Sequence, residues 1–264
     1  MAVKAMLTMV GLGALFALIL AIANQRLKVE EDPRVEELAG KLPGLNCGAC
    51  GFPSCHEFAK TVVSGGKIET MCRMASPEAR ELISRITGVK KEAVKRVACV
   101  FCGASSREKT SNARYEGIET CRAADIISGA GMNCAYGCIG YGDCAKACPF
   151  GGIEMKDGLP RIDPDRCIAC GKCVEACPRD IIGLIPYEPK NVVIPACRSK
   201  DAGGRVRSIC AVGCIGCRIC EKLSGGVFRV EDNLARIDTS RMTEEIDWDR
   251  IIEKCPAGTI VRLR

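Results

Sequence analysis

The sequence predicts a small, loop-rich α+β fold with one N-terminal transmembrane helix, a small helical module, and βαβ repeats of which the second is degenerate. Three observations predict it. The chain opens on an uncharged apolar run, it has 21 cysteines among 264 residues with only 4% aromatic residues, and a cysteine pattern recurs after 76 residues. So few aromatic side chains do not build a large core. We therefore expect the fold to be held together by what the cysteines bind.

The apolar run extends from Ala5 to Ala23, 19 residues without a charge, close to the ~20 residues that cross a bilayer as a helix. A cleaved signal peptide is the alternative, because the run ends in Ala-Ile-Ala, which resembles a cleavage site. However, the run exceeds the usual ~7 to 15 residues. More basic residues follow it than precede it, which favours a cytoplasmic side for the rest of the chain. We predict a single-pass anchor in the cell (inner) membrane over residues 1–25.

Residues 26–90 are predicted to form a small helical module. One polar helix extends from Pro33 to Lys41. Another begins behind Ser76, a good N-cap, with Pro77 at the first helical position, and it ends at Gly88.

A dense cysteine run in residues 131–188 is typical of bacterial two-cluster ferredoxins. It reads C-x3-C-P and then C-x2-C-x2-C-x3-C-P. In such domains the fourth cysteine of each half ligates the cluster of the other half. Zinc ribbons are the alternative, but they seldom place three cysteines at this spacing before C-P. The pattern predicts a ferredoxin-like domain with a [4Fe-4S] cluster at Cys148, Cys167, Cys170 and Cys173.

The second copy, in residues 189–264, repeats one half of this pattern. Where the other half would have its ligands, it has Ser224, Met242, Glu245 and Trp248. Four ligands that act as one unit are expected to be lost together, so this supports the crossed pattern. The half that remains predicts a [4Fe-4S] cluster at Cys214, Cys217, Cys220 and Cys255.

The partner cluster of the first copy lacks one expected ligand, because Tyr141 stands where the second copy has Cys217. Three cysteines remain, and Cys134 is the most suitable fourth. A three-ligand [3Fe-4S] cluster is the alternative. The predicted ligands of this second site are Cys134, Cys138, Cys144 and Cys177.

The helical module contains a separate set of four cysteines, with glycines between the first of them. Such glycines leave backbone N–H groups free to approach cluster sulfurs. His56, the only histidine, would suggest a Rieske-like or zinc site, but a second histidine is missing. A [4Fe-4S] cluster is predicted at Cys47, Cys50, Cys55 and Cys72.

A fifth [4Fe-4S] cluster is predicted from the remaining cysteines. Cys99 and Cys102 form a C-x2-C pair in residues 91–130, which we interpret as a basic linker region. Their available partners are Cys121 with Cys197 or Cys210. Because 21 cysteines divided by four leave one over, we expect four to five clusters.

Net charge and missing motifs argue against other functional classes. The formal charge is +6, but each cluster with four thiolates adds about −2, so five would bring it to about −4. Basicity is therefore no evidence for nucleic acid. The sequence has no G-x-G-x-x-G behind a strand, no P-loop and no nucleophile with a base, so we predict no catalytic residue.

Sequence blocks along nearly the whole chain resemble the RnfB/RsxB family, the iron–sulfur subunits of Rnf complexes. They read D-P-R-V-E-E-L (32–38), L-P-G-L-N-C-G-A-C-G (42–51), V-A-C-V-F-C-G (97–103), C-A-Y-G-C-I-G (134–140) and C-P-F-G-G-I (148–153).

This resemblance implies an electron-transfer subunit of a membrane-bound oxidoreductase that pumps Na⁺ or H⁺. Soluble ferredoxin would be its electron donor. Nicotinamide, flavin and ion pathways would lie in the other subunits of the complex. The alternatives are a ferredoxin-like subunit of another membrane dehydrogenase or hydrogenase, and, in a different class, a zinc-binding structural or nucleic-acid-binding protein.

Overall fold

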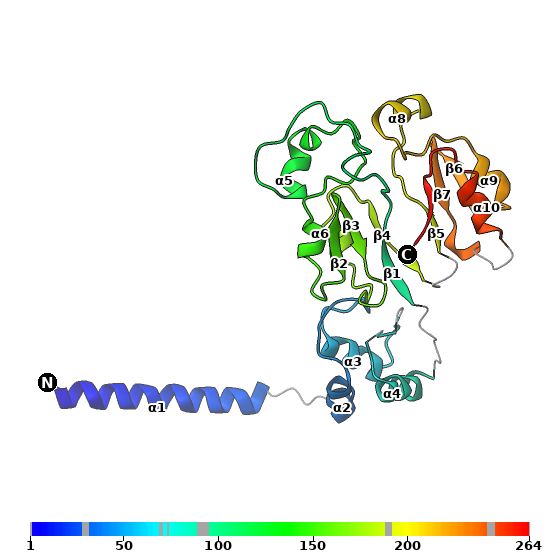
Figure 1. Cartoon of the computed structure of the whole chain (residues 1–264). Helices are drawn as coiled ribbons and strands as arrows, with labels where there is room; N and C mark the ends of the chain where they lie inside the picture. Colours follow the sequence, from blue (N-terminus) through cyan, green and yellow to red (C-terminus); the bar gives the residue numbers. More distant parts are fainter. Residues whose placement is uncertain are drawn as a thin grey trace. The chain divides into compact units, whose positions relative to one another are not determined.

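The computed structural model describes residues 2–27, 32–68, 71–72, 74–88, 95–187, 192–241 and 246–263. Short helices and two-stranded sheets follow one long helix (Figure 1). The chain divides into two compact units, of which the first comprises residues 1–46, 54–68 and 75–89 and the second the rest. Met242 and Glu245, named above as replaced ligands, lie outside the described residues.

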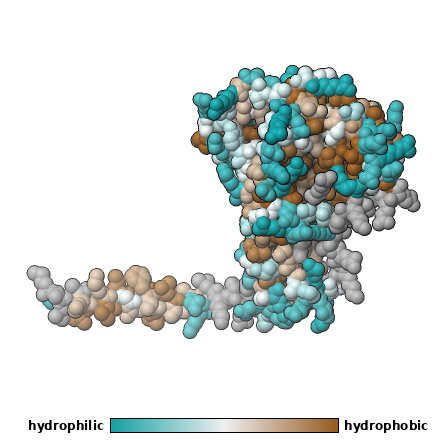
Figure 2. Space-filling view, in the orientation of Figure 1, coloured by the Kyte–Doolittle hydropathy of each residue, from teal (hydrophilic) through white to brown (hydrophobic). Residues whose placement is uncertain are grey.

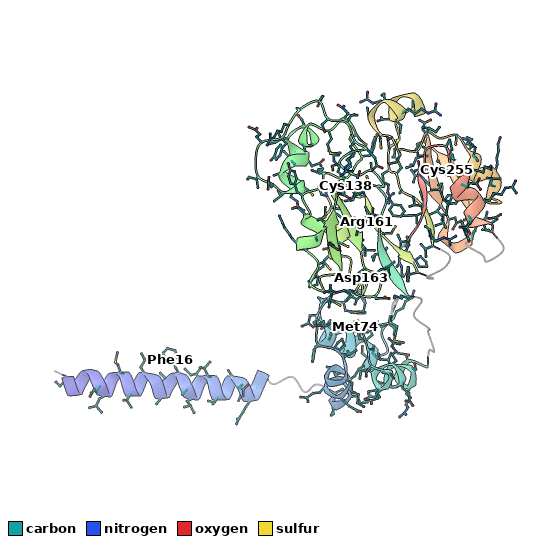
Figure 3. The ribbon with its side chains drawn as sticks, viewed as in Figure 1. Phe16, Met74, Cys138, Arg161, Asp163 and Cys255 are labelled. Carbon is teal, nitrogen blue, oxygen red and sulfur yellow. The ribbon has the colours of Figure 1, made fainter. Side chains whose placement is uncertain are left out.

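Helix α1 (Ala2–Leu27) begins the first unit and contains the apolar run. Its segment Met9–Arg26 is long and apolar enough to cross a membrane. Figure 2 shows apolar residues along this helix, and Phe16, labelled in Figure 3, is 56% exposed. An apolar helix whose side chains find no protein core is a candidate for burial in lipid.

Three short helices form the core of the first unit: α2 (Pro33–Lys41), α3 (Cys55–Val63) and α4 (Pro77–Thr87). Before α4, Ser76 Oγ accepts a 3.1 Å hydrogen bond from the backbone N of Ala79, and Gly88 ends the helix at φ 68°. The predicted bounds of α2 and α4 are thus confirmed. The apolar faces of these helices bury Leu38, Phe58, Val62 and Ile83.

The second unit contains two repeats with the same order of strands and α-helices. In the first repeat, β1 (Arg96–Val100) pairs with β4 (Ile182–Pro186), and β2 (Ile153–Lys156) forms a hairpin with β3 (Leu159–Ile162). The helical elements of this repeat are α5 (Cys121–Ile126), η1 (Ser128–Gly131), α6 (Asp143–Lys146) and α7 (Lys172–Glu175).

In the second repeat, β5 (Val193–Pro195) pairs with β8 (Ile260–Arg262), and β6 (Phe228–Glu231) forms a hairpin with β7 (Leu234–Ile237). Its helical elements are α8 (Gly203–Ile209), α9 (Ile219–Leu223), η2 (Thr239–Arg241) and α10 (Trp248–Glu253). All the strand pairs in the described ranges are antiparallel. The predicted βαβ unit, with its parallel strands, is thus not found among these pairs. In each repeat the first strand pairs with the last, and the hairpin lies between them in the sequence.

We expected residues 91–130 to form a linker, but residues 95–130, the part that the structure describes, contribute to both repeats. Strand β1 is part of the first repeat through its pairing with β4. Beyond it, the backbone N of Gly103 donates to Ala196 O at 2.9 Å and the N of Thr110 donates to Ile209 O at 3.1 Å. Hydrogen bonds thus join this segment to the second repeat.

The degenerate half of the second repeat contains a packed apolar core. Trp248 is 5% exposed and meets the Phe228 ring edge to face, with 6.3 Å between ring centroids. Ser224 Oγ accepts a 2.9 Å hydrogen bond from the backbone N of Phe228. Ser224 and Trp248, which stand at two positions of the missing cysteines, are thus both buried in this half.

Candidate iron–sulfur sites

Four cavities in the second unit are each lined by four cysteines. The space inside each, its mouth included, is about 350 to 420 Å³. Within the described ranges, no three His, Cys, Asp or Glu side chains lie close enough together to hold a single metal ion. Four thiols around a wide cavity fit a multi-atom iron–sulfur cluster better than one zinc ion, which its ligands contact at ~2.3 Å.

The first of these cavities contains the expected set Cys148, Cys167, Cys170 and Cys173. Gly171 turns the chain into α7 at φ 83°, which places the next cysteine on the helix. The backbone N of Ala98 donates to Cys167 Sγ at 3.3 Å, and that of Gly152 donates to Cys148 Sγ at 3.3 Å. Such N–H groups would stabilise the charge on a thiolate.

Burial raises the pKa of the Cys173 thiol to about 12, with smaller contributions from the neighbouring cysteines. A buried thiolate is costly unless a cation compensates its charge. Thiolates in this cavity therefore require a bound metal group, whose binding releases their protons.

A second cavity is lined by Cys121, Cys138, Cys144 and Cys177. Burial raises the pKa of Cys144 to about 11, with smaller contributions from Cys121 and Cys177. This set differs from our expectation, which had Cys134 as the fourth ligand. The structure brings Cys121 there instead.

The local sequence explains the position of Cys121. Thr120 caps α5, because its Oγ1 accepts a 3.2 Å hydrogen bond from the backbone N of Ala123, and Cys121 is therefore the first residue of that helix. Sequence reasoning did not assign Cys121 to this cavity because it lies 17 residues before Cys138. Tyr141 occupies the loop position of the missing cysteine, so the fourth thiol comes from elsewhere.

A third cavity contains the expected set Cys214, Cys217, Cys220 and Cys255. Arg218 adopts φ 62° where the chain enters α9, at the position that corresponds to Gly142 in the first repeat. The backbone N of Ala235 donates to Cys214 Sγ at 3.4 Å. Figure 3 labels Cys255 in this repeat and Cys138 in the other.

A fourth cavity is lined by Cys102, Cys134, Cys197 and Cys210. Burial raises the pKa of Cys210, and Cys102 and Cys134 are among the groups that raise it further. Cys102, Cys197 and Cys210 were expected in a fifth set. Cys134 joins them instead of Cys99 and Cys121.

Cys99 lies apart from the four cavities. It is fully buried in β1, in an apolar cluster with Val97, Ile185 and Ile194. Desolvation raises its pKa to about 12. The C-x2-C spacing suggested a ligand pair, but Cys99 lies within the strand and Cys102 lies beyond its end.

The N-terminal cysteines lie in both units. Cys55 is the first residue of α3 behind the N-cap Ser54, and its backbone N donates to Asn46 Oδ1 at 2.8 Å. His56 is exposed. The other three cysteines of this expected set, Cys47, Cys50 and Cys72, belong to the second unit.

Two family models match the chain. The one described as a putative Fe-S cluster matches residues 42–74, and the one described as a 4Fe-4S dicluster domain matches residues 133–181. The first match contains Cys47, Cys50, Cys55 and Cys72. Iron–sulfur binding is thus indicated in both units.

Curated relatives match over nearly the full length. The chain is 38% identical, over 94% of its length and 88% of the relative, to the B component of the proton-translocating ferredoxin:NAD(+) oxidoreductase complex of Clostridium ljungdahlii. It is 38% identical, over 94% of its length and 74% of the relative, to the B component of the Na(+)-translocating ferredoxin:NAD(+) oxidoreductase complex of Acetobacterium woodii. The B component of the ion-translocating oxidoreductase complex of Methanosarcina acetivorans is 35% identical over 91% of this chain and 92% of that protein. The chain therefore belongs to the RnfB family, the B components of the ion-translocating ferredoxin:NAD⁺ oxidoreductase (Rnf) complexes.

Proposed function

We propose that this protein is the electron-transfer subunit of a membrane-bound, ion-translocating oxidoreductase, and that it relays electrons from reduced ferredoxin to partner subunits. The observation that carries the proposal is the convergence of cysteines, four at a time, on separate cavities of one unit. A bound [4Fe-4S] cluster supplies one-electron redox chemistry. The family membership adds the setting, a multi-subunit complex at a membrane.

Four ligand sets follow from the cavities and the family match. In the second unit, the first, second and third cavities each hold one [4Fe-4S] cluster. Because the second cavity has four cysteines, a three-ligand [3Fe-4S] cluster is not needed there. The proposed ligands are Cys148, Cys167, Cys170 and Cys173; Cys121, Cys138, Cys144 and Cys177; Cys214, Cys217, Cys220 and Cys255; and, from the family match to residues 42–74, Cys47, Cys50, Cys55 and Cys72.

Backbone N–H groups are the means by which this chain would tune its clusters. Ala98, Gly152 and Ala235 donate to cysteine sulfurs at 3.3 to 3.4 Å. A hydrogen bond to the sulfur stabilises the more negative state, so each one favours the reduced cluster.

We propose the following roles for the other parts of the chain, from the N-terminus onward. Helix α1 anchors it in the membrane in a single pass, and the remainder lies on the cytoplasmic side. Behind the helical module, the two ferredoxin-like repeats begin near β1 and β5. Nicotinamide chemistry and ion movement belong to partner subunits, and nucleic acid is not a partner.

Anaerobic purification of the full chain in detergent tests this proposal. We expect about 16 to 20 Fe per chain, four per cluster, with matching acid-labile sulfide. Reduced ferredoxin should bleach the cluster absorbance. Stoichiometric zinc without sulfide would support the structural or nucleic-acid-binding alternative and overturn the proposal, as would full iron content that ferredoxin cannot reduce.

A further inference from the structure

The fourth cavity lies between the two repeats and receives two cysteines from each. Cys102 and Cys134 come from the first repeat, Cys197 and Cys210 from the second. Its space is about 420 Å³. Of these four residues, the family matches cover Cys134 alone. No C-x2-C-x2-C pattern groups them, because they lie in four separate segments.

The four cysteines form two equivalent pairs. Cys102 and Cys197 each stand two residues beyond the first strand of their repeat, since β1 ends at Val100 and β5 at Pro195. Cys134 and Cys210 each stand four residues before the first loop cysteine of their repeat, Cys138 and Cys214 respectively. The two repeats thus present the same pair of positions to one cavity.

Backbone donors reach one sulfur of each repeat. The N–H of Cys138 donates to Cys102 Sγ at 3.4 Å, and in the second repeat the N–H of Ser199 donates to Cys197 Sγ at 3.4 Å. A sulfur that accepts N–H donors suits a thiolate ligand.

Glycines keep the cavity open beside the other two sulfurs. A Cβ at Gly137 would lie 3.4 Å from Cys134 Sγ, and a Cβ at Gly213 would lie 3.5 Å from Cys210 Sγ. These two glycines also occupy equivalent positions, 76 residues apart. Both line the cavity, so a side chain at either position would contact one of its sulfurs.

Positive charge also collects at this cavity. Lys109 and Arg198 line it, and Lys109 Nζ donates to Cys138 O at 2.7 Å. The Nε of Arg198 is buried and has no hydrogen-bond partner within the described part of the chain. Four thiolates around a cluster carry a net negative charge, which these two cations would offset.

We propose that Cys102, Cys134, Cys197 and Cys210 hold a further [4Fe-4S] cluster that bridges the two repeats. This inference rests on the proposed function and extends it. One electron at a time would pass through this cluster between the neighbouring sites, with no bond formed or broken. Cys134 and Cys138, like Cys210 and Cys214, are four residues apart, so their Cα atoms are separated by at most about 14 Å.

Paired cysteine variants in the full chain test the ligand set. The variants are Cys102→Ala with Cys197→Ala, Cys134→Ala with Cys210→Ala, and all four together, each purified anaerobically for iron and sulfide analysis. If the four residues serve one cluster, each pair and the quadruple variant should lose the same amount, about four Fe per chain. Cys99→Ala, the matched control in β1, should retain the full iron content.

Additive loss of iron in the quadruple variant would contradict a single bridging cluster. If the quadruple variant loses about eight Fe while each pair loses about four, the residues belong to two clusters. Unchanged iron in both pairs would also overturn the bridge. Neither result affects the proposed function, because the other ligand sets would keep about 16 Fe. Circular dichroism and the EPR spectra of the remaining clusters report whether each variant is folded.

Discussion

Arg179 forms a 2.7 Å ion pair with Asp125 in the first repeat, and its side chain is only 6% exposed. The same guanidinium donates to the carbonyl oxygens of Cys134 and Gly137 at 2.9 and 2.8 Å. Arg179 follows the Cys177–Pro178 turn directly. One buried cation thus joins the turn that carries one proposed ligand to the loop that carries another.

Arg179→Ala should destabilise the second unit. It removes one partner of a largely buried ion pair and leaves carbonyl oxygens without a donor, which together cost about 3 kcal/mol. We expect a lower thermal midpoint in anaerobic circular dichroism. Arg85→Ala is the control, because the Arg85–Glu81 pair is 72% and 66% exposed, and such surface pairs contribute at most about 0.5 kcal/mol. Equal shifts in the two variants would contradict a structural role for Arg179.

Crossed ligation predicts which cluster depends on Cys177. Cys177→Ala should damage the cluster at Cys121, Cys138 and Cys144 and should leave the cluster of the first cavity intact, although Cys177 follows Cys173 closely in sequence. Cys121→Ala should remove the same EPR component as Cys177→Ala, because both residues line one cavity. Loss of the other component in the Cys177 variant would show that the ligands are not crossed.

Local spacing predicted those sites whose ligands lie on one tight loop. Cys167, Cys170 and Cys173 are brought together by their own loop and the short α7, so the sequence alone suffices. The ends of a helix could be predicted in the same way, as at Ser76 and Gly88. Such features depend on residues that are adjacent in the sequence, so the sequence alone is enough to predict them.

The candidate ligands that lie far apart in the sequence could not be assigned in the same way. The 76-residue offset pairs Cys121 with Cys197, yet in the structure the counterpart of Cys197 is Cys102, because each stands two residues beyond the first strand of its repeat. The segment between Cys102 and Cys134 is longer than the one between Cys197 and Cys210, and it brings Cys121 to another cavity. Only the fold shows which segments meet.

Trp248→Ala should lower stability without loss of iron. Trp248 and Phe228 form the apolar core of the degenerate half, and truncation of a buried Trp costs about 3 to 5 kcal/mol. We expect a lower thermal midpoint with the iron content of the unaltered chain. Trp248→Phe, which keeps most of the side-chain volume, should lower the thermal midpoint much less. Iron loss in the Ala variant while it remains folded would contradict a role in packing alone, because Cys214 and Cys220 belong to the same apolar cluster.

The basic segment near Cys102 is a candidate docking surface for an acidic ferredoxin, but several of its charges have partners within the chain. Lys95 Nζ lies 3.3 Å from Asp165 Oδ1, Arg96 donates to Leu184 O, and Lys109 Nζ binds Cys138 O. Two further lysines, at 90 and 91, lie outside the described residues. Arg107 is exposed, and so is Arg114, whose Nε lies 3.9 Å from Glu116 Oε1 at the surface. These two arginines are therefore the residues with which to test docking.

Charge reversal at these two arginines should slow electron transfer from ferredoxin. Soluble ferredoxins are usually acidic, and opposite charge raises the association rate through long-range attraction. Arg107→Glu with Arg114→Glu should lower the rate of cluster reduction roughly tenfold at low salt. At 1 M salt, where the Debye length is ~3 Å, the difference should nearly vanish. Stopped-flow bleaching of the clusters by reduced ferredoxin measures both rates.

A variant with the same change in net charge separates local docking from global repulsion. Lys222→Glu with Arg229→Glu alters two exposed residues of the second repeat. If ferredoxin docks near the first repeat, this pair should change the low-salt rate far less, because the reversed charges lie away from the encounter surface. Equal slowing by both pairs would mean that only total charge matters. Unchanged rates in the Arg107 and Arg114 variant, at full iron content, would move the docking site away from this segment, with the residues around Cys47 and Cys50 as the next surface to test.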